Sequence, residues 1–158
     1  MTGKIIKLIA SIVICQLAGV IGALFNGTAV KTWYVGIAKP AFTPPGWVFA
    51  PVWITLFLLM GISLFLVWNA DADPKIKQTA LVLFFIQLVL NTCWSYFFFY
   101  LNSPLAGFIE IIILWIFILL TVLRFYAVRP AAAFLLVPYI LWVSFAAFLT
   151  FSIWQLNR

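Results

Sequence analysis

Long apolar runs alternate with short polar breaks along the whole chain. A helix that crosses roughly 30 Å of hydrocarbon needs about 20 apolar residues, and five runs with almost no charge reach that length. The pattern predicts an all-α integral membrane protein, a bundle of five transmembrane helices with a long structured loop between helices 1 and 2. The predicted spans, in one domain of residues 1–158, are residues 5–25, 47–68, 79–100, 105–123 and 131–154.

Proline and polar residues mark the ends of these spans. The segment from Asn69 to Pro74 ends the second span, Asn102-Ser-Pro104 turns between the third and fourth, and Arg129-Pro130 opens the fifth. Proline is tolerated in the first turn of a helix, where its missing N–H has no helical partner. Pro138 lies inside the fifth span, so we expect a kink there, with neighbouring helices bonding the freed carbonyl.

Composition supports a membrane protein and excludes several kinds of site. Apolar residues make up 67% of the chain and charged residues only 8%, against about 45–50% and about 25% in soluble domains. The chain has no histidine, which excludes a histidine-ligated metal, a Ser-His-Asp triad and a Cys-His nucleophile within one chain. Cys15 and Cys93 lie far apart in apolar runs and are interpreted as small buried hydrophobes. No metal site is predicted.

The net charge of +6 is interpreted as a sign of orientation and of contact with anionic lipid, and no nucleic-acid partner is expected. Five spans place six basic residues on the side of the N-terminus and three on the other side. The positive-inside rule then predicts a cell-membrane protein with a cytoplasmic N-terminus and an external C-terminus. The two groups are Lys4, Lys7, Lys75, Lys77, Arg124 and Arg129, and Lys31, Lys39 and Arg158.

The connection of residues 26–46 is by far the longest, and loops of this length in compact domains are usually functional or disordered. Its aromatic residues favour burial, and its prolines stiffen the backbone. We therefore expect a partly rigid flap over one end of the bundle. An aromatic anchor at the lipid headgroups, without a ligand, is the alternative.

Aromatic residues recur at helical spacing in three spans. Faces that converge beneath the loop would enclose a pocket for a flat, mostly apolar ligand. Simple packing of aromatic residues is the alternative for each face. The three faces carry Phe49, Trp53 and Phe57; Gln87, Asn91, Trp94 and Phe98; and Tyr139, Trp142, Ala146 and Leu149.

Other residues of the spans suggest helix packing. Gln87 and Asn91 are expected to hydrogen-bond between helices more than to bind ligand. Glu110 is the one acidic residue of the spans, and such a residue is a candidate functional site, although a structural role near an interface is the favoured interpretation. The pairs Ala18-x3-Gly22 and Gly19-x3-Ala23 permit close helix approach, within the bundle or in a dimer.

Three blocks of sequence resemble a known family. The first is Trp33-Tyr34-x4-Lys39-Pro40-x3-Pro44-Pro45-x3-Phe49-x-Pro51-x-Trp53, whose fixed positions follow no helical or strand period. The others are Asn91-x2-Trp94-Ser95-x-Phe97-Phe98 and Pro138-Tyr139-x2-Trp142-x2-Phe145-Ala146. Together they resemble the tryptophan-rich sensory protein family, also called the translocator protein or peripheral benzodiazepine receptor family.

The resemblance implies a pocket for tetrapyrroles such as protoporphyrin IX and haem, and for synthetic benzodiazepine-site ligands. It implies a tetrapyrrole as ligand, no obligatory cofactor, and a homodimer. The implied pocket residues are Tyr34, Trp53, Phe57, Asn91, Trp94, Trp142, Ala146 and Leu149. The implied lid residues are Trp33, Pro40, Pro44, Pro45 and Trp47.

The resemblance also implies a chemistry. Bacterial members are associated with light- and oxygen-dependent breakdown of protoporphyrin, which Trp53 and Trp142 would promote by photochemistry, without a conventional acid–base site. Porphyrin propionates are expected near Lys31 or Lys39. A transporter of porphyrins or similar small molecules and a non-catalytic ligand sensor or scaffold are the alternatives.

The chain departs from the family pattern at two places. Phe42 stands where members often have tryptophan, which could weaken the stacking or hydrogen bonding of the lid. The C-terminal segment 149–158 lacks the tyrosine of the sterol-recognition pattern of animal members, a weak pattern even when intact. High-affinity cholesterol binding is therefore not predicted.

Overall fold

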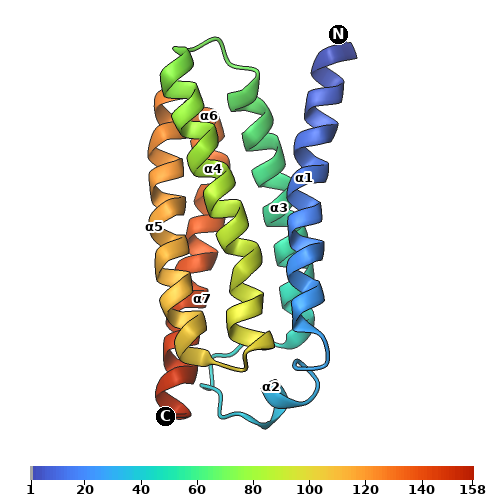
Figure 1. Cartoon of the computed structure of the whole chain (residues 1–158), viewed down its shortest axis with the longest axis vertical. Coiled ribbons are helices and arrows are strands. Elements are labelled where there is room, and N and C mark those ends of the chain that lie inside the picture. The colour runs from blue at the N-terminus through green and yellow to red at the C-terminus, as the bar shows by residue number, and fades with distance from the viewer. Residues whose placement is uncertain (1) are drawn as a thin grey trace.

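The computed structural model describes residues 2–158, and it confirms the expected fold class. Five helical segments in this range are long and apolar enough to cross a membrane. They run side by side in alternating directions, and the N- and C-termini lie at opposite ends of the bundle (Figure 1). The segments are α1 (Thr2–Asn26), α3 (Gly46–Trp68), α4 (Pro74–Ser95) continued by the π-helix η1 (Tyr96–Tyr100), α5 (Pro104–Val128), and α6 (Pro130–Leu135) followed by α7 (Val137–Leu156).

Most helices begin at a proline or a polar cap and are longer than the apolar spans predicted from the sequence. The Asp73 carboxylate accepts hydrogen bonds from the backbone N–H groups of Lys75 and Ile76, and Pro74 follows it in the first turn of α4. Ser103 caps α5 in the same way, through the N–H of Ala106. These caps satisfy N–H groups that have no partner within the helix, which is why α4 begins at Pro74 and not at residue 79.

The fifth span breaks at Leu136, two residues before Pro138. The Leu136 N–H turns to the carbonyl of Ala133 at 3.0 Å, which frees the carbonyl of Ala132 from its usual i+4 donor. The Ser63 hydroxyl of α3 donates to that carbonyl at 2.7 Å, in a buried position. The helix is interrupted close to Pro138, as expected, and a neighbouring helix bonds a freed carbonyl, although this carbonyl belongs to Ala132 and not to the residue four positions before the proline.

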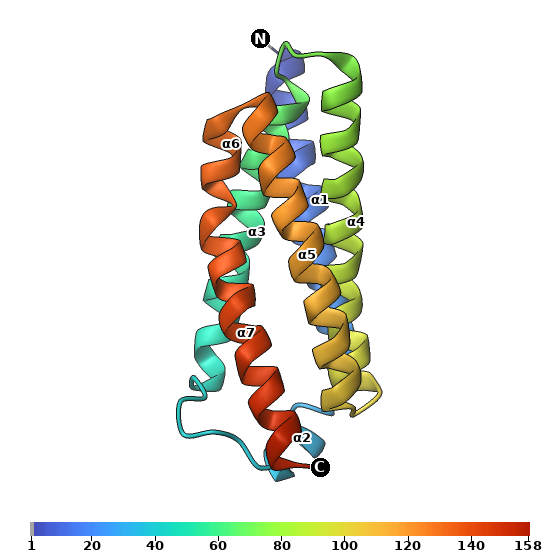
Figure 2. The same ribbon diagram turned by 90° about the vertical axis from the view of Figure 1, so that its left-hand side faces the viewer.

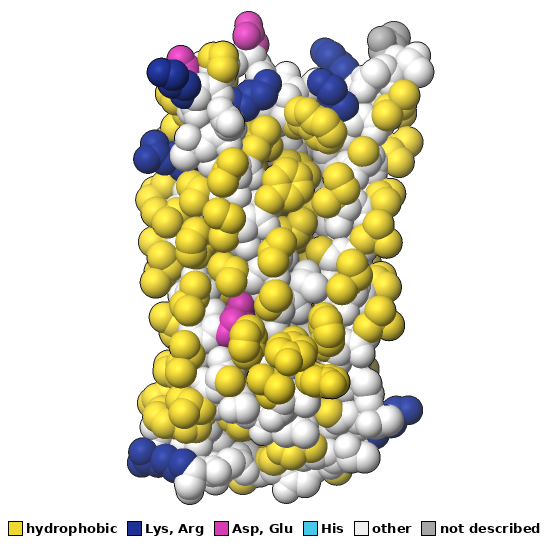
Figure 3. All heavy atoms as spheres, viewed as in Figure 1, with side chains coloured by type: hydrophobic (Ala, Val, Ile, Leu, Met, Phe, Trp, Pro, Cys, Tyr) yellow, Lys and Arg dark blue, Asp and Glu magenta, His cyan; other side chains and the backbone are white. Residues whose placement is uncertain are grey.

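The half of the bundle near the N-terminus is a solid apolar core. The rings of Phe84 and Phe125 stack with centroids 5.5 Å apart, and both side chains are fully buried together with Met60, Leu64 and Val67. Figure 3 shows an apolar belt across the face in view, basic side chains at both ends of the molecule, and an acidic side chain within the belt.

The loop between α1 and α3 closes the other end of the bundle. This segment, residues 27–45, is called the roof loop below, and it contains the single-turn helix α2 (Trp33–Gly36). It crosses beneath the bundle and passes next to the C-terminal end of α7 (Figure 2). The end that it covers is called the loop end.

Candidate ligand cavity

A cavity of about 650 Å³ occupies the loop end of the bundle. Its walls come from α1, α3, α4, η1, α5 and α7, and residues of the roof loop close it from below. Its volume lies within the range of small-molecule sites, about 300–1,000 Å³. The aromatic faces of the second, third and fifth spans do converge on one space.

The structure brings all eight expected pocket residues to this cavity. They come from the roof loop and from helices α3, α4 and α7, so no single segment of the chain contains the site. The lining residues include Tyr34, Trp53, Phe57, Asn91, Trp94, Trp142, Ala146 and Leu149.

Trp53 and Trp142 face the cavity from α3 and α7. Trp53 packs against Phe57, with centroids 5.5 Å apart, and against Tyr139 at 6.4 Å. Trp142 meets the edge of Phe49 at 5.9 Å and lies 5.6 Å from Phe145. Neighbouring rings therefore hold both indoles in place at the wall.

A buried polar chain joins α4 to α7 beside the cavity. The Asn91 amide donates to the Tyr139 hydroxyl at 2.8 Å, and that hydroxyl donates to the Gln87 side-chain oxygen at 2.8 Å. The expected hydrogen bonding of Gln87 and Asn91 between helices is present. Asn91 also lines the cavity, so one residue connects the scaffold with the site.

Two indole N–H groups at the wall have no acceptor. The Nε1 atoms of Trp94 and Trp142 are buried and lack a hydrogen-bond partner among residues 2–158. A buried donor without an acceptor costs free energy. Both residues line the cavity, but neighbouring groups cover these two nitrogen atoms.

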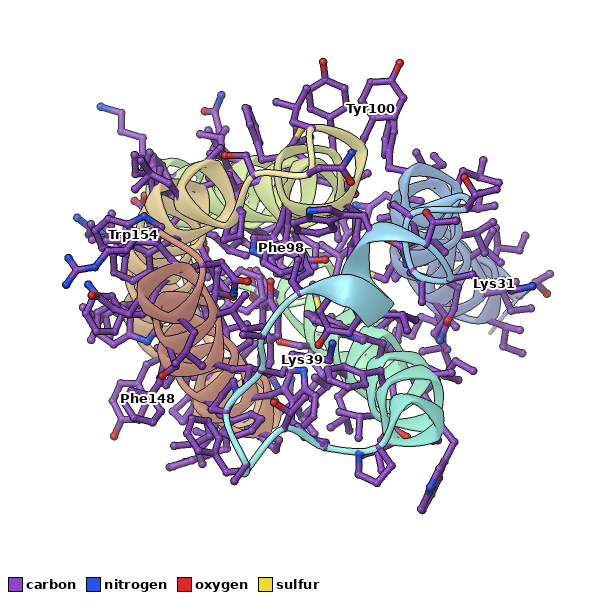
Figure 4. All side chains as sticks on the ribbon, turned by 90° about the horizontal axis from the view of Figure 1, so that it is seen from below. Lys31, Lys39, Phe98, Tyr100, Phe148 and Trp154 are labelled. Carbon is purple, nitrogen blue, oxygen red and sulfur yellow. The ribbon has the colours of Figure 1, made fainter. Side chains whose placement is uncertain are left out.

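The π-helix η1 forms part of the cavity wall at the loop end. Its hydrogen bond runs from the Leu101 N–H to the Tyr96 carbonyl, five residues back, and such insertions are frequent at functional sites. Phe98 of this turn stacks on Trp94 with centroids 5.0 Å apart and is buried. Figure 4 shows Phe98 inside the ring of helices, beneath the roof loop. The apolar pattern predicts a helix here but does not reveal the extra residue in the turn.

The expected lid residues take different positions. Pro44 lines the cavity, whereas Pro40 and Pro45 are in the loop but not on the lining. Trp33 packs on Phe98 with centroids 5.5 Å apart. Trp47 is 76% exposed at the start of α3 and does not line the cavity. Exposure of this kind places an indole at the membrane surface, where tryptophan is common.

Phe42, the residue that departs from the family pattern, is also in the lid. Its ring stacks on Phe148 of α7, with centroids 5.3 Å apart and an interplanar angle of 16°. Phenylalanine therefore keeps a stacking contact between the roof loop and α7, although it has no N–H to donate.

Of the two expected propionate partners, only Lys39 lines the cavity. Its ammonium donates to the carbonyls of Tyr34 and Ile37, at 2.6 and 3.0 Å, and lies 4.8 Å from the centre of the Tyr34 ring. Burial raises the pKa of the Tyr34 hydroxyl above its ordinary value of 10.0. Lys31 lies at the periphery beside α1 (Figure 4).

Sequence reasoning missed Asn157, which fastens the roof loop to α7. Its side-chain oxygen accepts from the Ala38 N–H at 3.0 Å, and its amide donates to the Ala38 carbonyl at 2.9 Å and to the Ile153 carbonyl at 2.7 Å. The two partners are 119 residues apart. An asparagine after the last helix gives no signal of such a contact in the sequence.

Sequence reasoning also missed the wall that α1 provides. The small residues Ala18, Gly19 and Gly22 line the cavity, and a side chain at Gly19 would collide with the Phe57 ring at 2.5 Å. Ala18 and Gly22 are buried inside the bundle. The small pair Ala18-x3-Gly22 therefore serves the interior of one chain.

Glu110 lies outside the lining of the cavity, although its neighbour Ile111 is part of it. Its side chain is only 5% exposed, and neither carboxyl oxygen has a hydrogen-bond partner among the described residues. Within residues 2–158, Glu110 therefore does not cap a neighbouring helix through its carboxyl group.

Comparison with known proteins agrees with the three sequence blocks. The TspO/MBR family model matches residues 11–155. The chain is 44% identical to the tryptophan-rich protein TspO of Chlorobaculum tepidum, over 99% of each chain, and 44% identical to the protein of that name from Archaeoglobus fulgidus, over 98% and 99%. It is 35% identical to the human translocator protein, over 87% of this chain and 82% of that protein. The chain is a multi-pass membrane protein and belongs to the TspO/MBR family.

Proposed function

We propose that this protein is a membrane receptor for flat tetrapyrroles, with protoporphyrin IX and haem as its ligand class. The observation that carries the proposal is the aromatic cavity of about 650 Å³ beneath the roof loop. Aromatic walls suit the faces of a macrocycle. Synthetic benzodiazepine-site ligands, which are also flat and mostly apolar, fit the same description.

Binding would rest on stacking and shape. The chain has no histidine. Among residues 2–158, Lys39 is the one basic residue on the lining of the cavity, so it is our candidate partner for a propionate. Because such a site does not depend on the metal, we expect protoporphyrin IX to bind as readily as haem.

We further propose that the bound porphyrin is degraded in light and oxygen. An excited porphyrin is a strong one-electron oxidant, and an indole held against its face can donate the electron. Dioxygen then adds to a methine bridge of the reduced porphyrin, and the adduct returns one electron to the oxidised indole. Cleavage of the O–O bond and of the carbon–carbon bond leaves the two oxygen atoms as two carbonyl groups of an opened macrocycle. The ligand carries the chemistry, and Trp53 and Trp142 supply orientation and electrons.

The test is illumination of purified protein with protoporphyrin IX, with loss of the Soret band as readout. We expect loss with the wild type in air and light, and none in the dark or without oxygen. Trp53→Phe and Trp142→Phe should slow the loss by about ten-fold, a barrier change of about 1.4 kcal/mol. Trp68→Phe is the matched control, because Trp68 lies at the far end of α3, near Lys7.

Two results would contradict the proposal in different ways. Soret loss that both substitutions leave unchanged, with binding intact, rules out the tryptophan chemistry. Absence of binding by the wild type rules out the tetrapyrrole receptor itself.

Transport is the second candidate, and the name of the human relative, translocator protein, favours it. The solid core around Phe84 and Phe125 argues against a path through the bundle. A transporter predicts porphyrin flux into sealed liposomes, and a non-catalytic sensor predicts binding without a photoproduct.

We also propose a cytoplasmic N-terminus and a homodimer. The orientation is supported by six basic residues at the end of the N-terminus against three at the loop end. The roof loop and the cavity mouth would then face the outside of the cell.

A further inference from the structure

The cavity is walled unevenly. Six of its lining residues are exposed on the surface of the molecule, and all six belong to α1, α3 or the roof loop. No lining residue of α4, η1, α5 or α7 is exposed. The exposed six are Val20, Ala23, Val30, Gly46, Ala50 and Ile54.

These residues frame an opening between α1 and α3. Val20 and Ala23 form its edge on α1, and Ala50 and Ile54 form its edge on α3. Val20 is 56% and Ile54 60% exposed, although both also line the cavity. A side chain with both properties lies where the inside meets the outside.

The opening has a defined upper edge, on the side away from the roof loop. The Gln16 amide donates to the Ile54 carbonyl at 3.0 Å and ties α1 to α3. Further from the roof loop the two helices are in close contact, because a Cβ at Gly61 would lie 2.6 Å from the Ile12 Cα. The helices therefore seal the bundle from Gln16 toward the N-terminus. On the other side of Gln16 the Phe57 ring of α3 still packs against Gly19 of α1, and the gap lies between that contact and the roof loop.

The chemistry of the frame matches lipid. Its side chains are aliphatic, and alanine and glycine at positions 23, 46 and 50 add little bulk. Both helices are predicted to cross the hydrocarbon layer, so this gap faces acyl chains and not water. An apolar guest that is dissolved in the membrane would meet no desolvation cost at such an entrance.

The roof loop, by contrast, is fastened. Asn157 holds Ala38 by two hydrogen bonds, and Lys39 binds the carbonyls of Tyr34 and Ile37. Phe42 stacks on Phe148. Opening the loop would break all of these contacts, whereas the side chains that frame the side opening are aliphatic and have no hydrogen bonds to break.

We propose that ligands enter this cavity sideways from the membrane, between α1 and α3, while the roof loop stays closed. This proposal rests on the proposed receptor function. It restricts the ligands to flat molecules that partition into the bilayer. A ligand confined to water would bind poorly even if it fitted the cavity.

The experiment measures the rates of protoporphyrin IX binding and release in phosphatidylcholine nanodiscs by stopped-flow fluorescence. Ala50→Leu, Ala50→Phe and Ala50→Trp fill the gap stepwise, alone and with Ala23→Trp. Leu17→Trp on α1 and Leu58→Trp on α3 are matched controls, because both positions are exposed but do not line the cavity.

A second arm locks the roof loop. Ala38→Cys with Asn157→Cys replaces the observed clamp by a disulfide, in a background of Cys15→Ala and Cys93→Ala. The reduced form of the same variant is its control.

We expect both rate constants to fall with the size of residue 50, by about ten-fold or more for tryptophan, and the locked loop to leave them within about two-fold. A slower dissociation distinguishes a blocked passage from a damaged site, which would release its ligand faster.

Two results would overturn the side entrance, provided that equilibrium binding is retained. The first is that the substitutions at Ala50 leave the rates of ligand binding and release unchanged. The second is that locking the roof loop stops ligand binding and release. Absence of any binding by the wild type overturns the receptor function, and the side entrance with it.

Discussion

Single polar side chains within the spans decide how the helices are tied together. The Tyr139 hydroxyl is fully buried, accepts from Asn91 and donates to Gln87. Polar groups inside a membrane are costly unless they have partners. One tyrosine thus pairs the Asn91 donor and the Gln87 side-chain oxygen of α4 and ties α4 to α7.

Tyr139→Phe removes this central hydroxyl and leaves the Asn91 donor and the Gln87 acceptor without it. We expect a loss of about 1–2 kcal/mol in stability, seen as a lower apparent melting temperature in detergent. Tyr126→Phe is the control, since Tyr126 is 56% exposed on the outside of α5. Equal effects of the two substitutions would contradict a structural role for the chain of hydrogen bonds.

At the scale of elements, close approach and local irregularity position the site. Gly61 lets α3 lie against Ile12 of α1, and the π-turn η1 rotates Phe98 into the interior. The break at Leu136 has its partner, Ser63, on another helix, and Phe98 of η1 packs against Trp33 of the roof loop.

Gly61→Ala should separate α1 from α3, because the added Cβ would lie 2.6 Å from the Ile12 Cα, a backbone atom. Overpacking of this kind costs about 1–3 kcal/mol, measurable by thermal unfolding. Gly22→Ala is the matched control, because its nearest neighbour would be 3.7 Å away. A stable Gly61→Ala protein would show that the two helices are not in tight contact.

Asn157→Ala should loosen the roof loop by removing its two hydrogen bonds to Ala38. We expect faster hydrogen exchange of the loop amides, most of all at Ala38, by about ten-fold for each 1.4 kcal/mol lost. Gln155→Ala changes a nearby polar residue and is the control. Unchanged exchange at Ala38 would mean that the aromatic contacts alone hold the loop.

On the scale of the whole molecule, the bundle has one solid half and one hollow half. The solid half carries the core around Phe84 and Phe125, and the hollow half carries the cavity and the roof loop. The basic side chains in view lie at the two ends, outside the apolar belt (Figure 3). Stability and function are therefore assigned to different halves of one small domain.

The proposed orientation predicts which end a membrane-impermeant thiol reagent reaches. In right-side-out vesicles without Cys15 and Cys93, Ala41→Cys in the roof loop should be labelled at once. Ala131→Cys, at the opposite end, should be labelled only after permeabilisation. The reverse pattern would place the N-terminus outside, against the distribution of basic residues.

The sequence by itself determined the fold class, and together with the family resemblance it indicated eight of the residues that line the cavity. Apolar runs long enough to cross a bilayer allow few structures other than helices, because every backbone group must find a partner within the span. Helical spacing then placed Trp53, Asn91 and Trp142 on their faces. The resemblance to the family indicated that these faces line a pocket and are not simply packed against one another.

Only the tertiary structure decided which of those residues meet and where the cavity opens. The wall from Ala18 and Gly19, the clamp at Asn157 and the exposure of Trp47 depend on how helices approach each other. Such contacts join residues far apart in the chain, and no local pattern specifies them. The gap between α1 and α3 is likewise set by the Gln16 bond and the Gly61 contact, which exist only once the helices have packed.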